Sequence, residues 1–164
     1  MNNRTTGKFS DTYLTPPNLI RALGEFDFDP CCPSNMPWRT AKQMIRETDP
    51  EEDGLKTEWF GRVWCNPPYS KIMPWVIKMI KHNHGIMLLP AKSQDTRWAQ
   101  TAIQSASIVL FLKNRIMFCL PDGTPTTGKW SPNMLLAFGD DDANMLIQLN
   151  KTNKDFLGIL VINV

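Results

Sequence analysis

The stretch Val63-Trp64-Cys65-Asn66-Pro67-Pro68-Tyr69-Ser70 decides the expected fold, because an apolar run ends there in a loop of specific chemistry. Residues 62–65 are short, apolar and aromatic-rich, which predicts a β-strand. Two consecutive prolines cannot donate hydrogen bonds to a strand ladder, so the strand has to end before them. Both prolines also fix their own φ angles, and the backbone therefore leaves the strand in one direction with little freedom.

The loop after this strand presents hydrogen-bond acceptors beside a flat ring. Asn66 supplies a side-chain carbonyl, Pro67 and Pro68 supply backbone carbonyls, and Tyr69 supplies the ring. These groups match an exocyclic amine on a planar heterocycle, such as that of adenine or cytosine. Acceptors that bind the developing sp3 ammonium better than the flat amine lower the barrier to attack by nitrogen. The alternative, a simple turn that leaves a strand, stays open from these four residues alone.

At this point the chain resembles the S-adenosylmethionine-dependent amino-methyltransferases, and more closely the phage-type DNA N6-adenine methyltransferases. Their catalytic motif reads Asp/Asn/Ser-Pro-Pro-Tyr/Phe after a strand. Further blocks follow in the family's order over most of the chain, namely Thr12-Tyr13-Leu14-Thr15-Pro16, Phe26-Asp27-Phe28-Asp29-Pro30, Glu52-Asp53-Gly54-Leu55, Trp59, Leu88-Leu89-Pro90-Ala91, Arg115-Ile116-Met117-Phe118 and Ser131-Pro132-Asn133. The resemblance implies that the catalytic residues are Asn66, Pro67, Pro68 and Tyr69.

The resemblance also implies a set of residues around the methyl donor, S-adenosylmethionine. These expected cofactor-binding residues are Tyr13, Thr15, Pro16, Asp29, Pro30 and Asp53, with the Asp53 carboxylate accepting from the adenine amine of the cofactor. Structural roles remain open beside these: Thr15 as a helix cap, Asp29 as a loop-capping aspartate, and the acidic run around Asp53 as a solvated surface. Most methyltransferases have a Gly-x-Gly turn after the first strand, whereas this chain has Cys31-Cys32-Pro33. That departure fits the narrower, phage-type resemblance and weakens the broader one.

Length and composition are those of an ordinary globular protein. The 164 residues include 42% hydrophobic and 21% charged residues, which predicts one domain over residues 12–164 behind a flexible leader over residues 1–11. A signal peptide and an apolar run long enough to span a bilayer are both missing, so we expect a cytoplasmic location, the host cytoplasm if the gene belongs to a phage or prophage. The net charge of +2 is permissive of nucleic acid.

The cysteines do not have the spacing of a metal site. Cys31 and Cys32 are adjacent, and Cys65 and Cys119 are far from both in the sequence, which matches none of the usual zinc-ligand patterns even with His82 and His84 counted. We expect reduced structural thiols. No metal is required, since the sulfonium of the methyl donor supplies the electrophile.

The N-terminal half is expected to form two elements before the central loop. Residues 17–24 predict a short helix with Thr15 as its cap and Gly24 at its end. Residues 25–29 alternate apolar and acidic side chains, which predicts a strand ending at Asp29-Pro30. In doubly wound sheets ligands bind at the carboxyl ends of strands, which places Asp29 where a cofactor contact is expected. Residues 33–48 are not assigned.

The C-terminal half continues an alternation of helices and strands. Apolar residues at three- and four-residue steps predict a helix over residues 70–82, capped by Ser70, and a buried strand follows at 86–90. A helix capped by Asp95 precedes a strand at 107–112. Residues 133–138 predict a strand, 139–142 a turn, and 155–164 a last strand at the antiparallel end of the sheet. The fold class is therefore α/β, a single-domain Rossmann-like methyltransferase fold with a mostly parallel sheet and an antiparallel C-terminal part.

The expected partner is double-stranded DNA, with no membrane and no obligate protein partner. The target base would flip out of the duplex, and loop 121–132 would close over it or over its flanking phosphates. The expected nucleic-acid-binding residues are Ser70, Lys71, Lys113, Arg115, Lys129 and Trp130. Methylation of an RNA adenine or a protein glutamine amide stays open as a second enzyme hypothesis. A nucleic-acid-binding module that has lost transfer stays open because of the atypical Cys31-Cys32 segment.

Overall fold

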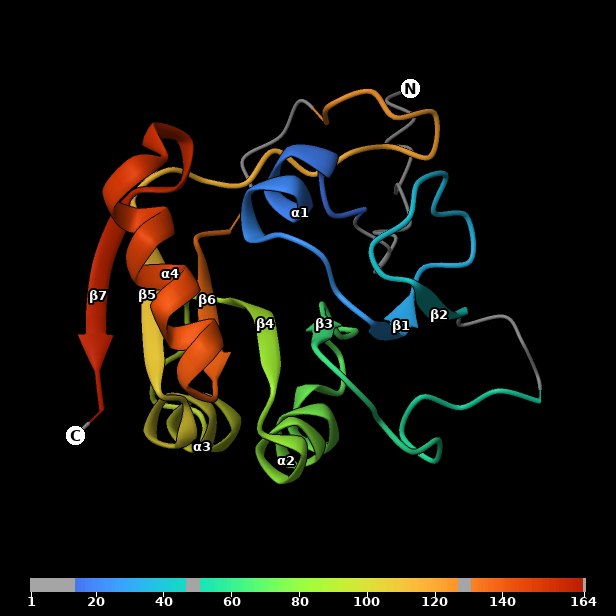
Figure 1. The fold of residues 1–164 in the computed structure, drawn as a ribbon, viewed down its shortest axis with the longest axis horizontal. Helices are drawn as coiled ribbons and strands as arrows, with labels where there is room; N and C mark the ends of the chain where they lie inside the picture. The colour runs from blue at the N-terminus through green and yellow to red at the C-terminus, as the bar shows by residue number, and fades with distance from the viewer. Residues whose placement is uncertain (1–13, 47–50, 127–130, 164) are drawn as a thin grey trace, which may run out of the picture.

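The computed structural model describes residues 14–46, 51–126 and 131–163, which form helices packed on one seven-stranded sheet. The strand order is β2-β1-β3-β4-β6-β5-β7. Figure 1 shows the elements, which in chain order are α1 (Pro17–Leu23), β1 (Phe28–Cys32), β2 (Gln43–Arg46), β3 (Val63–Cys65), α2 (Ile72–His82), β4 (Gly85–Pro90), α3 (Arg97–Ser105), β5 (Ile108–Leu112), β6 (Asn133–Phe138), α4 (Asp140–Thr152), the 3-10 turn η1 (Lys154–Phe156) and β7 (Gly158–Ile162).

The sheet has a parallel part and an antiparallel part. Strands β2, β1, β3 and β4 pair in parallel, whereas β6 runs antiparallel to both of its neighbours, β4 and β5. Strand β5 therefore points the same way as β4, and β7 closes the sheet antiparallel to β5. The predicted α/β class is confirmed, as is the mostly parallel sheet with an antiparallel C-terminal part.

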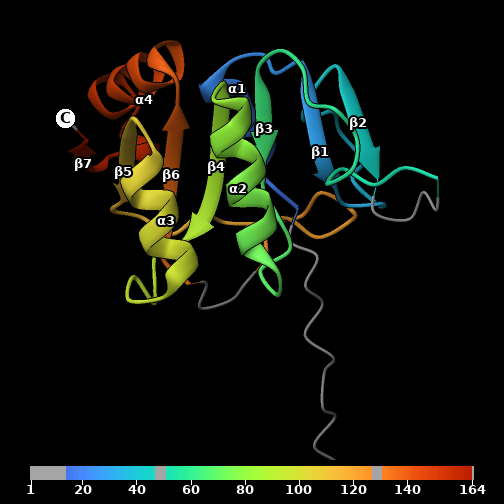
Figure 2. The same cartoon turned by 90° about the horizontal axis from the view of Figure 1, so that it is seen from below.

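Apolar side chains cover both faces of the sheet. One core lies between the sheet and helices α1 and α4, and a second lies between the sheet and helices α2 and α3, which lie side by side in Figure 2. Within β4, Ile86 belongs to the first core and the next residue, Met87, belongs to the second. A strand covered on both faces needs apolar residues at every position, which is why the run at 86–90 does not alternate.

The strand order reverses next to β1. The chain passes from β1 to β2 on one side, and then returns to place β3 on the other side of β1. Phe28 of β1 pairs with Val63 of β3, so the two strands start level with each other. In open α/β sheets a reversal of this kind leaves a crevice at the carboxyl ends of the two strands, and ligands bind there. Strand β3 ends at Cys65, directly before the Asn66 loop.

The strand predicted at residues 25–29 is wrong in its bounds, because β1 runs over Phe28–Cys32 and all five of its residues are buried. β1 is an inner strand whose residues are all buried, so the single polar residue Asp29 does not end it. Pro30 is tolerated because the register against β2 is irregular between Asp29 and Cys32. Strand β2 was not predicted; it is a short edge strand in which only Ile45 is fully buried, so it carries no apolar pattern.

The three predicted helix caps are also wrong. None of helices α1, α2 and α3 has a side-chain hydrogen bond at its first residue, and the N-cap positions are occupied by Pro16, Lys71 and Thr96 instead of Thr15, Ser70 and Asp95. Each helix starts one residue or more later than the predicted cap requires. The end of α1 is confirmed, because Gly24 follows it with φ of 86°, a conformation that glycine adopts without strain.

The turn predicted at 139–142 is in fact the start of α4. The acidic residues Asp140 and Asp141 lie in its first turn, where negative charge favours the helix dipole. Its buried stripe of Ala143, Leu146 and Leu149 packs on the first core. The predicted last strand is shorter than expected, at Gly158–Ile162, but it does form the antiparallel edge of the sheet.

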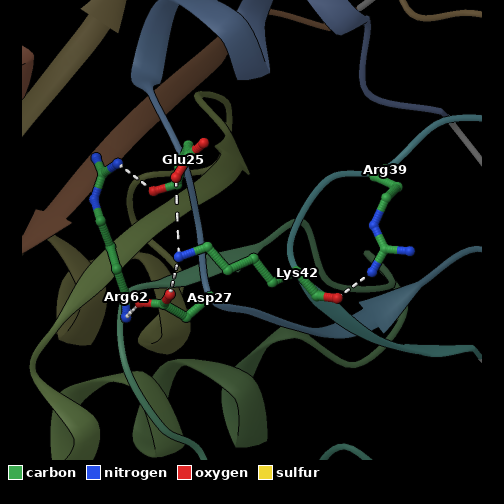
Figure 3. Close-up of polar contacts among 5 residues, drawn as sticks. All are labelled: Glu25, Asp27, Arg39, Lys42 and Arg62. Atoms are coloured by element: carbon green, nitrogen blue, oxygen red, sulfur yellow. Dashed lines mark hydrogen bonds and ion pairs between the residues drawn. The ribbon is translucent and has the colours of Figure 1, made fainter.

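A polar cluster joins the starts of three parallel strands at the edge opposite to the Asn66 loop, as Figure 3 shows. The Asp27 carboxylate accepts from the backbone N–H of Arg62 (2.9 Å) and from Lys42 Nζ (2.9 Å). The Arg62 side chain donates to the backbone carbonyl of Glu25 (3.0 Å), and Arg39 donates to the carbonyl of Lys42. These contacts connect the segments that lead into β1, β2 and β3, and so hold their register.

Candidate active site

The Asn66 loop is held by a residue from the N-terminal segment. The Asn66 side-chain nitrogen donates to the hydroxyl oxygen of Thr15 at 3.2 Å, and Thr15 is 1% exposed. The Pro68 carbonyl accepts from the backbone N–H of Lys71 at 3.2 Å, which turns the chain toward α2. Among the backbone acceptors of the loop, the Pro68 carbonyl is thus engaged in a turn.

The other end of the loop is connected to β6. The Asn133 side-chain nitrogen donates to the Tyr69 hydroxyl at 3.2 Å, and Asn133 is 1% exposed. Asn133 is the first residue of β6 and pairs with Pro90, the last residue of β4. Sequence reasoning did not assign Asn133 to the site. Its only signal was its place in the Ser131-Pro132-Asn133 block.

The Asp29 carboxylate is buried and makes local bonds. Its two oxygens accept from the hydroxyl of Thr40 and from the backbone N–H of Cys31, the second at 3.1 Å. Asp29 is 2% exposed and Thr40 is also 2% exposed. The structure therefore shows the loop-capping contacts of Asp29, which order the backbone after the middle of β1. Sequence reasoning missed Thr40, and no pattern in the sequence marks it.

The turn that contains Asp53 packs directly on β1. A Cβ atom added to Gly54 would lie 1.8 Å from the carbonyl oxygen of Pro30, so only glycine allows this approach. The Asp53 carboxylate accepts from the backbone N–H of Leu55 (2.9 Å) and contacts Lys56 Nζ at 3.3 Å. The pKa of Asp53 is lowered below its ordinary value. The hydrogen bond from the Leu55 N–H has the larger effect, and Lys56 has a smaller one. The structure thus brings together two of the segments that were expected to bind the cofactor.

The expected nucleic-acid-binding residues that the structure describes are exposed. Ser70 and Lys71 follow the Asn66 loop, and Lys113 and Arg115 follow β5. Because β5 points the same way as β4, its end lies at the edge of the sheet that carries the loop. Arg115 and Pro16 line one pocket of about 340 Å³, which places Arg115 next to the segment that holds Asn66.

Several expectations fall on residues outside the described ranges. These are the leader at residues 1–11, the cofactor residue Tyr13 and the nucleic-acid-binding residues Lys129 and Trp130. Pro16 and Pro30 are buried in the described part of the chain.

All four cysteines are buried thiols, as expected, and the sulfur atoms of Cys31 and Cys65 lie 3.6 Å apart on neighbouring strands. Over residues 14–46, 51–126 and 131–163, no group of three or more His, Cys, Asp or Glu side chains is arranged to hold a metal ion. In the same ranges, every helix is too short or too polar to cross a bilayer.

Comparison with known proteins adds a family match over most of the chain. A family model described as DNA N-6-adenine-methyltransferase (Dam) matches residues 2–157. A protein of Haemophilus phage HP1 (strain HP1c1), named DNA N-6-adenine-methyltransferase, is 31% identical over 121 residues, which are 70% of this chain and 67% of that protein. A protein of the same name from Escherichia phage T1 is 28% identical over 114 residues, 63% of this chain and 45% of that protein. No solved structure matches the chain significantly.

Proposed function

Because this chain belongs to the DNA N-6-adenine-methyltransferase family, we propose that it transfers a methyl group from S-adenosylmethionine to N6 of an adenine in double-stranded DNA. One observation carries the proposal. The Asn66 loop directly follows β3, and Asp29-Pro30 lies within β1; these are the two neighbouring strands between which the strand order reverses. A donor and an acceptor bound at the carboxyl ends of two neighbouring strands lie next to each other.

We assign the donor to the place where the Asp53 turn packs on β1. Asp53 is ionised at neutral pH, as any aspartate with an ordinary or lowered pKa is, and its carboxylate suits the exocyclic amine of an adenine ring. The close approach of Gly54 to Pro30 fixes the distance between this turn and β1. When bound, S-adenosylmethionine supplies an electrophilic methyl group on its sulfonium. We also propose that residues 12–164 form a Rossmann-like methyltransferase domain. Its place of action would be the host cytoplasm.

The Asn66 loop binds the target amine in this proposal. The side-chain oxygen of Asn66 and the carbonyl of Pro67 accept the two N–H groups of adenine N6. As N6 takes up the methyl group, the sulfur–methyl bond of the donor would break and leave a neutral thioether. N6 would become a tetrahedral ammonium, which both acceptors bind more strongly than the flat amine and which then loses one proton to water. The ring of Tyr69 stacks on the base. Stacking contributes roughly 1 to 3 kcal/mol per base, which offsets part of the few kcal/mol that base flipping costs.

The DNA backbone is assigned to the same edge of the sheet. Lys71 follows the loop directly, and Arg115 stands beside the Thr15-Pro16 segment that contacts Asn66. Lys113 adds a third positive charge after β5, and Ser70 offers a hydroxyl. Contacts to phosphate position the duplex without reading its sequence. Lys129 and Trp130 in loop 121–132 complete the proposed contact set.

A labelled-methyl assay tests the function directly. The purified protein is incubated with S-adenosylmethionine carrying a labelled methyl group and, separately, with duplex DNA, RNA and a protein mixture. We expect label in DNA, located on adenine N6 by nucleoside analysis, and no label with the Asn66→Ala variant. Sequencing that detects modified adenines in a host expressing the gene identifies the target site. Label in RNA or protein alone, or no label in DNA although the cofactor binds, would refute the proposal.

A further inference from the structure

Thr15 contacts the catalytic loop through its side chain. Its hydroxyl oxygen lies 3.2 Å from the Asn66 side-chain nitrogen, which donates a hydrogen bond to it. Thr15 was expected to cap α1, but the N-cap of that helix is Pro16 and the helix start has no side-chain cap bond. The hydroxyl of Thr15 is therefore directed to the loop at the end of β3 and not to the helix that follows it in the sequence.

Thr15 is itself held firmly from both sides. The indole N–H of Trp38 donates to the Thr15 carbonyl at 3.0 Å. The backbone N–H of Cys119 donates to the carbonyl of the preceding residue, Leu14, also at 3.0 Å. Pro16 restricts the backbone on the other side. With 1% of its surface exposed, Thr15 has little freedom to move, so its hydroxyl is a fixed reference point for the loop.

We propose that Thr15 is a positioning residue, which holds the Asn66 carboxamide so that its oxygen, and not its nitrogen, faces the target amine. This role rests on the proposed function. The last torsion of an asparagine side chain is broad and roughly two-fold, so an unrestrained amide presents either atom. An amide nitrogen turned toward adenine N6 would place two donors against each other. The bond to Thr15 engages the nitrogen and leaves the oxygen on the other side of the amide.

A matched pair of variants separates this role from a cofactor contact. Thr15→Val keeps the shape of the side chain but removes the oxygen, and Thr15→Ser keeps the oxygen. At saturating cofactor and DNA, we expect Thr15→Val to lower kcat about tenfold, the size of one lost hydrogen bond, while Thr15→Ser restores most of it. The dissociation constant of S-adenosylmethionine, measured by calorimetry, should change less than about twofold in both variants.

Two outcomes would overturn the role of Thr15. The first is an unchanged kcat in Thr15→Val. The second is a Thr15→Val variant that binds S-adenosylmethionine weakly and recovers the full kcat once the cofactor is saturating, because that pattern assigns Thr15 to the cofactor. Failure of the wild-type protein to methylate DNA is a separate result, since it refutes the proposed function and not the contact.

A second variant decides the question if Thr15→Val does not fold. Trp38→Phe keeps an aromatic ring but removes the N–H that holds the Thr15 carbonyl. We expect a smaller loss of kcat in the same direction, with unchanged cofactor affinity. A Trp38→Phe variant with the wild-type kcat would overturn the role of Thr15, because the proposed positioning depends on Thr15 being held in place.

Discussion

The side-chain nitrogen of Asn133 donates a hydrogen bond of 3.2 Å to the hydroxyl of Tyr69, and so connects the first residue of β6 to the last residue of the Asn66-Pro67-Pro68-Tyr69 loop. The buried Asn133 cannot move easily, because it pairs with Pro90 in the middle of the sheet. The ring of Tyr69 is thereby held at one end. A ring that is already in place loses little freedom when a base stacks on it.

This arrangement predicts different effects for two substitutions of Tyr69. Tyr69→Phe keeps the stacking surface and removes the hydroxyl that accepts from Asn133, so we expect kcat/KM on duplex DNA to fall less than about tenfold. Tyr69→Ala removes the ring, worth roughly 1 to 3 kcal/mol of stacking, and should reduce kcat/KM by about tenfold to a hundredfold. Labelled methyl transfer to duplex DNA measures both. Equal losses in the two variants would contradict a stacking role.

Asn66→Ala is expected to remove catalysis while the cofactor still binds. Loss of one preorganised group at a reacting centre costs about 100-fold or more in kcat. S-adenosylmethionine should bind as in the wild type, because Asn66 lies in the loop after β3, whereas the proposed donor site lies on β1 and the Asp53 turn. Calorimetry and single-turnover methylation measure the two quantities separately. Methylation by Asn66→Ala at the wild-type rate would exclude the loop from the mechanism.

Gly54→Ala should weaken cofactor binding without touching the catalytic loop. The new Cβ would meet the Pro30 carbonyl at 1.8 Å, so the Asp53 turn has to move away from β1. We expect a higher dissociation constant for S-adenosylmethionine and a lower melting temperature. Glu52→Ala is a suitable control, because Glu52 is an exposed neighbour in the same turn. If both variants bind the cofactor like the wild type, the turn is not part of the donor site.

The Asp27 cluster predicts an acid-dependent loss of stability. The pKa of Asp27 is lowered from its ordinary value of 3.8. The hydrogen bond from the Arg62 backbone N–H has the larger effect, and the hydrogen bond from Lys42 has a smaller one. A carboxylate with a lowered pKa in the folded state stabilises the fold above pH 3.8, and this contribution is lost as the pH falls through its folded pKa. Asp27→Asn should therefore be less stable at neutral pH, and its stability should change less below pH 4 than that of the wild type.

Chemical denaturation at several pH values tests this prediction. Glu25→Gln is the matched control, since its side chain is 89% exposed and stands 3.9 Å from Lys42, too far for a strong contact. The control should follow the wild-type curve. Parallel curves for Asp27→Asn and the wild type would show that the Asp27 carboxylate does not link the fold to pH.

Elements whose pattern is local could be predicted from the amino-acid sequence. The proline pair after Cys65 ended β3, the stripe of Trp75, Val76 and Met79 identified α2, and the unbroken apolar run before Pro90 identified β4. Each of these signals lies within a few residues of the element that it specifies. Helix α4 carried such a stripe too, but its three acidic first residues were interpreted as a turn.

Contacts between side chains of distant segments could not be predicted from local patterns. Thr15 and Asn66 are 51 positions apart in the sequence. Asp29 lies within β1, whereas its partner Thr40 lies in the segment between β1 and β2. Edge strand β2 has a single fully buried residue, so its pairing with β1 left no trace in the sequence. Periodicity reports the surroundings of one element, whereas a hydrogen bond between distant segments depends on strand order and register. Strand order and register are set by how the whole sheet packs. They place the Thr15 hydroxyl against the Asn66 loop, which the two prolines had already indicated in the sequence.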